Sequence, residues 1–434
     1  MGKYLTVGVG FSKKDNATQA AQEAAQKALA TMGKKKPQIA FVLYAGDYDP
    51  VQLNAVFKKA FKAVEYVGGS TDAVIYDGKE YVKGVTIACL QSDYMHFGVE
   101  SVDNITKNPA ELSRKTASAA VAKIPMDKYL DSYLAFSRVK KGNLQGIIRT
   151  PSFFVIVFTR GFQLNRFGNE DTIIAGIGDA TGQYVPIFGG SLGNDMDKVF
   201  KNEPYEIITF HSGKIMKDGL VVVFVSTGLV YVNTIAHGAT TTQTQGYISE
   251  VKNDGFVVVR INDMPIRDWY AQHIGIDRAE FDKKVLYYTQ KYPLGFPDGF
   301  GNIIMRAGGV PFGEDAFMYI APFKANTPVF LMNVEGDEKL LAGNKDIKES
   351  IEKHLQKKNL TPAFTFLASC SSRRRILSKA AYAKELTELG RSVQAPLFGF
   401  ASFGEIGSKP AEACHFNHLC NDVLNLYDML LPQI

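Results

Sequence analysis

Residues 185–193 read VPIFGGSLG, a short apolar run that leads directly into two glycines, a serine and a third glycine. The same design returns in APLFGFASFGEIG at residues 395–407 and, more loosely, in VEYVGGSTDAV at residues 64–74. Glycine after an apolar run is typical of a strand that ends in a tight turn, because glycine reaches backbone conformations that other residues avoid. Three copies of one pattern indicate an internal repeat.

Each copy lies at the same place in a longer unit, which reads strand, helix, strand, glycine turn and paired strands. We place the three repeat units at residues 37–90, 151–225 and 362–426. Hairpin strands lie antiparallel, and amphipathic helices cover sheet faces. The sequence therefore predicts a mixed α/β fold of repeated strand-helix-strand-hairpin units, with mixed, largely antiparallel sheets and helices packed on them.

Two regions fall outside the repeats. Residues 1–36 predict a short strand and an alanine-rich helix that Asp15 or Asn16 caps. Residues 244–335 contain GYISEVKNDGFVVVRIND, in which NDG is a strong hairpin turn signal, and the helix-like PIRDWYAQHIG. We expect a linker between these parts within residues 233–245.

The composition restricts the class of protein. A net charge of +5 over 434 residues is too dilute to indicate nucleic-acid binding, and 46% apolar residues are ordinary for a globular chain. Four cysteines are too few for a disulfide framework, and no apolar run approaches the roughly 20 residues of a membrane helix. We expect a cytoplasmic protein with reduced thiols and without membrane insertion.

The chain combines the segments VGVGFSKKDNATQAAQEAAQKAL, VGGST, FGGSLG, FHSGKIMKDGLVVV, VRINDMPIRDWYAQHIG, CSSRRRIL and LFGFASFGEIG. Together they resemble the FIST family, named for F-box and intracellular signal transduction proteins. The resemblance implies an N-terminal FIST domain over residues 1–235 and a C-terminal FIST domain over residues 236–434. It also implies a sensor for a small ligand, such as an amino acid or carboxylate, that signals to a separate histidine kinase, cyclase or chemotaxis protein.

The glycine turns are candidate ligand sites, because a Gly-Gly-Ser turn exposes backbone N–H groups to a carboxylate or another small anion. The same residues fit a purely structural turn. The candidates are Gly68, Gly69, Ser70, Gly189, Gly190, Gly399 and Ser402.

The segments CSSRRR and FGEIG add Cys370, Arg373 and Glu405 to the candidate ligand site. Arginine can bind a carboxylate through two hydrogen bonds, and Glu405 can bind the amine of a zwitterionic ligand. We therefore expect the ligand where these segments and the glycine turns converge in the C-terminal half. The alternative is a solvated loop for the arginines and a surface turn for Glu405.

The segment CHFNHLC contains Cys414, His415, His418 and Cys420 without the usual zinc spacing, and we expect no metal there. A cysteine-dependent hydrolase stays open as a second alternative, with Cys370 as nucleophile and His415 or His418 as base. No oxyanion or third-residue signature accompanies this pair. We therefore assign no catalytic residue and expect a protein that is not an enzyme.

One bacterial branch of the FIST family binds haem and senses nitric oxide through a histidine. The order Arg260, Pro265, Tyr270 and His273 in RINDMPIRDWYAQH is similar to the motif of that branch. The resemblance implies His273 as the axial ligand and Arg260 as the partner of a propionate. Haem is thus the alternative within the family, whereas the leading interpretation expects no cofactor.

Overall fold

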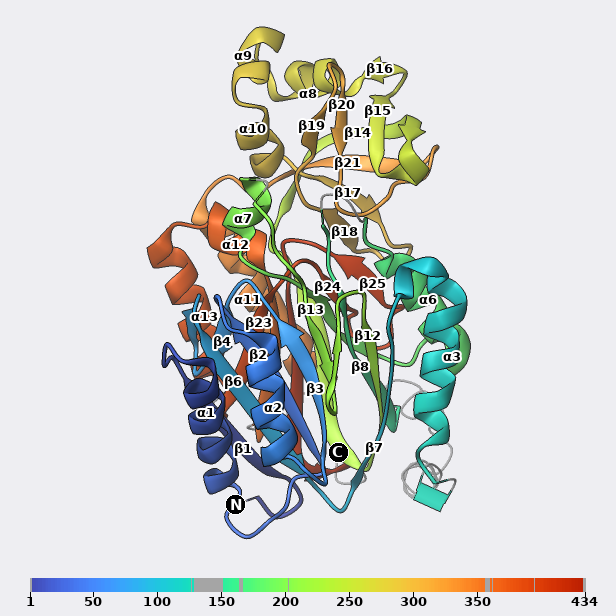
Figure 1. The fold of residues 1–434 in the computed structure, drawn as a ribbon. Helices are drawn as coiled ribbons and strands as arrows, with labels where there is room; N and C mark the ends of the chain where they lie inside the picture. Colours follow the sequence, from blue (N-terminus) through green and yellow to red (C-terminus); the bar gives the residue numbers. More distant parts are fainter. Residues whose placement is uncertain are drawn as a thin grey trace, which may run out of the picture.

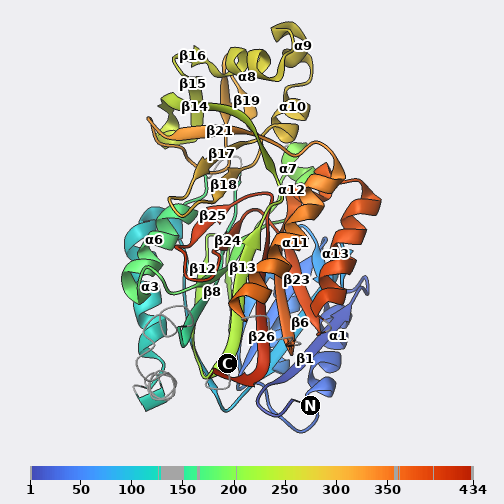
Figure 2. The same cartoon turned by 180° about the vertical axis from the view of Figure 1, so that it is seen from behind.

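Three six-stranded sheets form the body of the molecule, which we call the core, and residues 240–335 form a smaller body at one end, which we call the roof (Figures 1 and 2). The computed structural model describes residues 2–125, 127–128, 151–163, 167–201, 203–355, 360, 362–393 and 395–431. Among these residues, no helix is both long enough and apolar enough to cross a membrane.

The three core sheets share one strand pattern, in which a parallel pair is extended on both sides by antiparallel strands. The first sheet has the order β1(Thr6–Ser12), β6(Gly84–Gln91), β2(Ile39–Ala45), β3(Glu65–Ser70), β10(Thr209–His211), β11(Lys214–Met216). The second has the order β25(His415–Asn417), β24(Glu405–Gly407), β9(Ile187–Leu192), β8(Phe153–Arg160), β12(Leu220–Thr227), β7(Met95–Val102). The third has the order β13(Leu229–Ala236), β26(Asn421–Leu430), β22(Phe364–Cys370), β23(Leu397–Ser402), β4(Val74–Tyr76), β5(Lys79–Tyr81). The predicted mixed, largely antiparallel sheets are confirmed.

Every core sheet is completed by a hairpin from a different repeat unit. Hairpin β10–β11 of the second unit joins the first sheet, β24–β25 of the third unit joins the second sheet, and β4–β5 of the first unit joins the third sheet. One backbone hydrogen bond recurs at each junction: Ser70 N–H to Ile208 O at 2.9 Å, Ser191 N–H to Gly404 O at 2.9 Å, and Ala401 N–H to Ala73 O at 2.8 Å. The exchange ties the three units into a closed ring.

The double glycines lie inside strands β3 and β9, so the predicted turn at these positions is wrong. A Cβ on Gly68 would lie 2.0 Å from the carbonyl oxygen of Val42 in the parallel neighbour, and φ at Gly68 is +142°. A Cβ on Gly69 would lie 2.0 Å from the carbonyl oxygen of Ile208 in the exchanged hairpin. The first glycine therefore lets the parallel strands approach, and the second admits the strand from the other unit.

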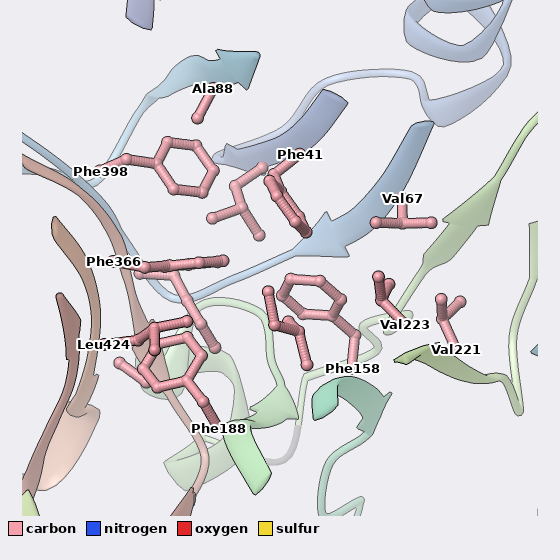
Figure 3. Packing of buried hydrophobic residues seen from close by; sticks show 14 of the residues in the cluster. Phe41, Val67, Ala88, Phe158, Phe188, Val221, Val223, Phe366, Phe398 and Leu424 are labelled. Atoms are coloured by element: carbon pink, nitrogen blue, oxygen red, sulfur yellow. The ribbon is translucent and has the colours of Figure 1, made fainter. Parts of the chain in front are cut away.

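The inner faces of the three sheets meet in one apolar cluster at the centre of the core (Figure 3). Phe366 of β22 lies at its middle, because the residue is fully buried and its ring contacts phenylalanines from all three sheets. The centroid of the Phe366 ring lies 4.8 Å from the ring centroids of Phe188 and Phe398, 5.4 Å from that of Phe41 and 6.0 Å from that of Phe158. Such offset and edge contacts add to the free energy gained by burying the rings.

Helices cover the outer faces of the core sheets (Figures 1 and 2). They are α1(Ala17–Thr31) and α2(Pro50–Ala60) on the first sheet, α3(Pro109–Ala122) and α6(Glu170–Thr181) on the second, and α11(Asp337–His354) and α13(Lys379–Val393) on the third. The central strands read as unbroken apolar runs because both of their faces are buried. Helix α1 begins after Asn16, one of the two predicted caps, whose side chain accepts a hydrogen bond from Gln19 N–H at 3.0 Å.

Two short helices, α7(Met196–Phe200) and α12(Ser371–Ile376), lie between the core and the roof (Figure 1). The roof strands are β14(Thr240–Lys252), β15(Val257–Ile261), β16(Met264–Pro265), β17(Leu294–Pro297), β18(Ile303–Arg306), β19(Val310–Phe312), β20(Ala316–Met318) and β21(Pro328–Asn333). Its helices are α8(Ile266–Ile274), α9(Arg278–Lys283) and α10(Val285–Lys291). The hairpin predicted around NDG is present as β14–β15, and the helix predicted for PIRDWYAQHIG is present as α8. Only residues 237–239 separate β13 from β14, so most of the expected linker is strand.

Replacing Phe366 by alanine should lower the free energy of unfolding by about 3–5 kcal/mol, because the change leaves a cavity where three sheets meet. Urea unfolding followed by circular dichroism measures the loss. Val51→Ala is the control, since Val51 is 63% exposed and its truncation should change stability little. A loss below about 1 kcal/mol at Phe366 would contradict the central role of this ring.

Candidate ligand-binding site

Helix α12 carries three consecutive arginines, and each binds a different part of the molecule. Arg373 is fully buried and forms an ion pair with Glu385 of α13, with Nε donating to the carboxylate at 3.1 Å. Its Nη atoms donate to the carbonyl oxygens of His237 at 2.9 Å and Leu340 at 2.8 Å, and also to that of Leu419. Arg373 therefore holds together the segment that leads into the roof and the helix that follows the roof.

Arg374 and Arg375 reach the other two repeat units. Arg374 Nη1 donates to Asp72 at 3.0 Å, just after β3, and the second oxygen of Asp72 accepts a hydrogen bond from Met196 N–H of α7 at 2.9 Å. Arg375 Nη2 donates to Asp197 of α7 at 2.6 Å. The three arginines thus connect all three units at one point below the roof.

Glu405 lies in a buried polar cluster with Ser402, Cys370 and Cys420. Its carboxyl group accepts hydrogen bonds from the Ser402 hydroxyl and from Cys420 N–H, the latter at 3.2 Å. Burial raises the pKa of Glu405 to about 8, so the group is largely protonated at neutral pH. The expected convergence is therefore partial, because Cys370, Ser402 and Glu405 meet whereas Arg373 forms its ion pair with Glu385.

Cys370 is a poor candidate for a nucleophile in this arrangement. Burial and the nearby Glu405 raise the pKa of its thiol to about 12, and a nucleophilic cysteine needs its thiolate form. The base candidates are also buried: burial lowers the pKa of His418 to about 3, and it lowers the pKa of His415 as well. These environments fit packing of the three side chains better than they fit a hydrolase.

The segment CHFNHLC does not form one continuous strand. Strand β25 covers only His415–Asn417, and Leu419 has a φ of +62° before β26 begins. Cys420 Sγ donates to the carbonyl oxygen of His418 at 3.3 Å. Among the described residues, no group of three or more His, Cys, Asp or Glu has an arrangement that holds a metal ion.

The three haem candidates lie in the roof. His273 is on the exposed side of α8, with its Nδ1 2.7 Å from the carbonyl oxygen of Trp269, whereas Tyr270 is fully buried. Arg260 is exposed on β15, and its Nε lies 3.2 Å from Oε2 of Glu250. None of the three lines the cavities described below, and haem binding stays a prediction.

The glycine candidates are divided among the three core sheets. Gly68, Gly69 and Ser70 lie in the first sheet, Gly189 and Gly190 in the second, and Gly399 in the third. Added Cβ atoms at these glycines would meet the backbone of neighbouring strands. The glycines instead allow neighbouring strands of the protein to pack closely against each other.

A cavity of about 330 Å³ lies between the core and the roof. Its core side comes mainly from residues just after parallel strands, with Leu419 before β26 as the exception. These residues are Phe162 after β8, Met196 and Val199 after β9, Ser372, Arg375 and Ile376 after β22, and Phe403 after β23. Its roof side includes Leu286, Gln290, Gly308, Met318 and Tyr319. The crevice beyond the carboxyl ends of parallel strands is the usual ligand site of α/β sheets. A smaller cavity of about 70 Å³ is lined by residues that include His237, Asp298, Lys409 and His415.

Two of the quoted sequence motifs reach the large cavity, but the predicted ligand residues do not line it. None of the ten predicted ligand residues lines the large cavity, yet Ser372 and Arg375 belong to CSSRRR and Phe403 belongs to FGFASFGEIG. The position of each motif just after a strand was the available signal. The roof residues carry no comparable motif, because ordinary apolar side chains line that side.

The chain matches two family models, one described as the FIST N domain over residues 38–264 and one described as the FIST C domain over residues 267–408. Among curated proteins, none matches significantly. A solved cyanuric acid hydrolase is similar at 10% identity and a TM-score of 0.30, over 54% of this chain and 72% of that one. PurLQS from Thermotoga maritima aligns at 10% identity and a TM-score of 0.19, over 100% and 74% of the two chains.

Glu405 makes stability depend on pH. The folded state keeps a proton on Glu405 that the unfolded state loses above the ordinary pKa of 4.5, so the free energy of unfolding falls as pH rises from 4.5 to about 8. Glu405→Gln should remove this contribution, worth up to about 1.4 kcal/mol per pH unit. Urea unfolding across this range should show the variant gaining stability relative to the original chain as pH rises.

The comparison isolates Glu405, because His418 and the other titrating groups are present in both proteins. The exposed Glu349 provides the matched control, since its glutamine variant should follow the original chain at every pH. Parallel pH curves for Glu405→Gln and the original chain would show that Glu405 keeps an ordinary pKa.

Arg373→Met should lower the free energy of unfolding by about 3–5 kcal/mol, because it leaves Glu385 buried without its ion-pair partner. Adding Glu385→Gln should recover part of this loss, since the unpaired charge is then removed. Urea unfolding of both single variants and the double variant gives the coupling energy. Arg391→Met on the exposed side of α13 is the control. Additive effects of the two changes would contradict a direct ion pair.

Proposed function

Because the chain belongs to the FIST family, whose domains are signal-transduction sensor domains, we propose that it is a sensory input protein that binds a small ligand in the cavity between core and roof. The ligand signal passes to a separate protein, for which the family resemblance implies a histidine kinase, a cyclase or a chemotaxis component. The family assignment supports the sensory role, and the cavity supports the location of the ligand.

The cavity carries this proposal through its size and position. Its volume of about 330 Å³ lies at the lower end of the roughly 300–1,000 Å³ of small-molecule pockets, and its lining is mainly apolar. Two bodies of the protein contribute to the lining, so a bound molecule touches both. Such a ligand stabilises the arrangement of core and roof that surrounds it best.

Helix α12 connects the cavity with the rest of the core. Ser372, Arg375 and Ile376 face the cavity, and Arg373 and Arg374 of the same helix bind the roof connection and the first repeat unit. A ligand that shifts α12 therefore acts on all three units together. We expect that a ligand in the cavity shifts α12, and that this shift alters the surface that a partner protein contacts.

Gly308→Leu should abolish ligand binding by filling the cavity. A Cβ at Gly308 meets its nearest neighbours, Gln290 and Thr289, at 3.5 Å, so the backbone can take a side chain without strain. Thermal shift against a metabolite library identifies a ligand for the original chain, with about 2.7 kcal/mol of added stability at 100 times the dissociation constant. Isothermal titration calorimetry then compares the variant.

Ala279→Leu is the matched control, because it adds the same side chain to an exposed roof position in α9 away from the cavity. The control should bind the ligand as the original chain does. Equal binding by Gly308→Leu and Ala279→Leu would place the ligand elsewhere and overturn the proposal.

A further inference from the structure

We infer that the cavity between core and roof takes an amphipathic organic anion, a molecule with an apolar body and one acidic group. This inference rests on the proposed function and names the ligand class. Of the two ligand classes that the family resemblance implied, an amino acid or a carboxylate, it favours the acid without an amine, because the lining lacks the carboxylate that an amine needs.

The lining offers one charge and a large apolar surface. Among the described residues around the cavity, Arg375 is the one that carries a charge, and no aspartate or glutamate is present. The apolar side chains include Phe162, Val199, Met318 and Ile376. An ammonium group inside the cavity finds no carboxylate on the lining, and burying an unpaired charge costs roughly several kcal/mol.

Two polar side chains of the cavity come from the same short helix. Ser372 and Arg375 are three residues apart on α12, which brings both side chains to one face of the helix. Gln290 of α10 adds an amide on the roof side. Ser372 and Arg375 therefore offer an acid group a polar part of the lining, whereas most of the other lining residues are apolar and suit the body of the ligand.

Arg375 is positioned at the edge of the cavity rather than in its depth. Its side chain is 24% exposed and donates to Asp197, which is 56% exposed. A guanidinium group has five N–H donors and can serve two carboxylates at once. Asp197 therefore orients Arg375 and also competes with the ligand for it, so its charge should tune the affinity for anions.

The test uses three probes that share a decyl chain and differ in charge: decanoate, decan-1-ol and decylamine. Calorimetric titration of the full chain, below the concentration at which the probes aggregate, should show decanoate binding roughly tenfold or more tightly than the other two. Arg375→Gln should remove this preference, Arg375→Lys should keep part of it, and Arg391→Gln should leave it unchanged. Gly308→Leu should bind none of the three.

A second variant tests the inference at an exposed side chain. Asp197→Asn changes an exposed side chain and removes the competing charge, so it should tighten decanoate binding several-fold and leave decan-1-ol unchanged. If decan-1-ol or decylamine binds as well as decanoate, and Gly308→Leu blocks it, the ligand class is wrong while the cavity site stands. If no probe binds the original chain, both the ligand class and the proposed cavity site are wrong.

Discussion

The exchange of hairpins among the repeat units is the constraint on which the rest of the structure depends. No unit completes its own sheet, since β4–β5, β10–β11 and β24–β25 each extend a sheet that another unit began. The double glycines follow from this arrangement, because Gly69 and Gly190 leave room for backbone that arrives from the next unit. The three inner faces are thereby fixed around one cluster of phenylalanines, of which Phe366 is the centre.

The exchange also explains why one short helix can bind every unit. The carboxyl ends of the parallel strands meet below the roof, and α12 begins directly after one of them. From that position Arg373, Arg374 and Arg375 reach the roof connection, the first unit and the second unit. The cavity borders the same helix, so the candidate ligand site and the junction of the units are physically continuous.

The sequence reveals the repeat because glycines that make room for backbone leave a local mark that recurs in each unit. It does not reveal the exchange, since nothing in a short hairpin strand such as KEY (β5) or KIM (β11) indicates which sheet the hairpin joins. It points to α12 through CSSRRR, but it cannot tell that Arg373 is buried against Glu385 while Arg375 reaches the cavity. The roof side of the cavity, with Gly308 and Met318, is hidden because its residues come from distant segments of ordinary composition.

The closed ring has a consequence for the order in which the chain folds as it is synthesised. Hairpin β4–β5 is made early, yet its partner strand β23 is among the last segments to appear. Pairings between segments so distant in sequence form slowly, because a long loop must close before its contacts can form. Until β23 arrives, the edges of the first hairpin lack their partner strand, and unpaired strand edges favour association with other chains.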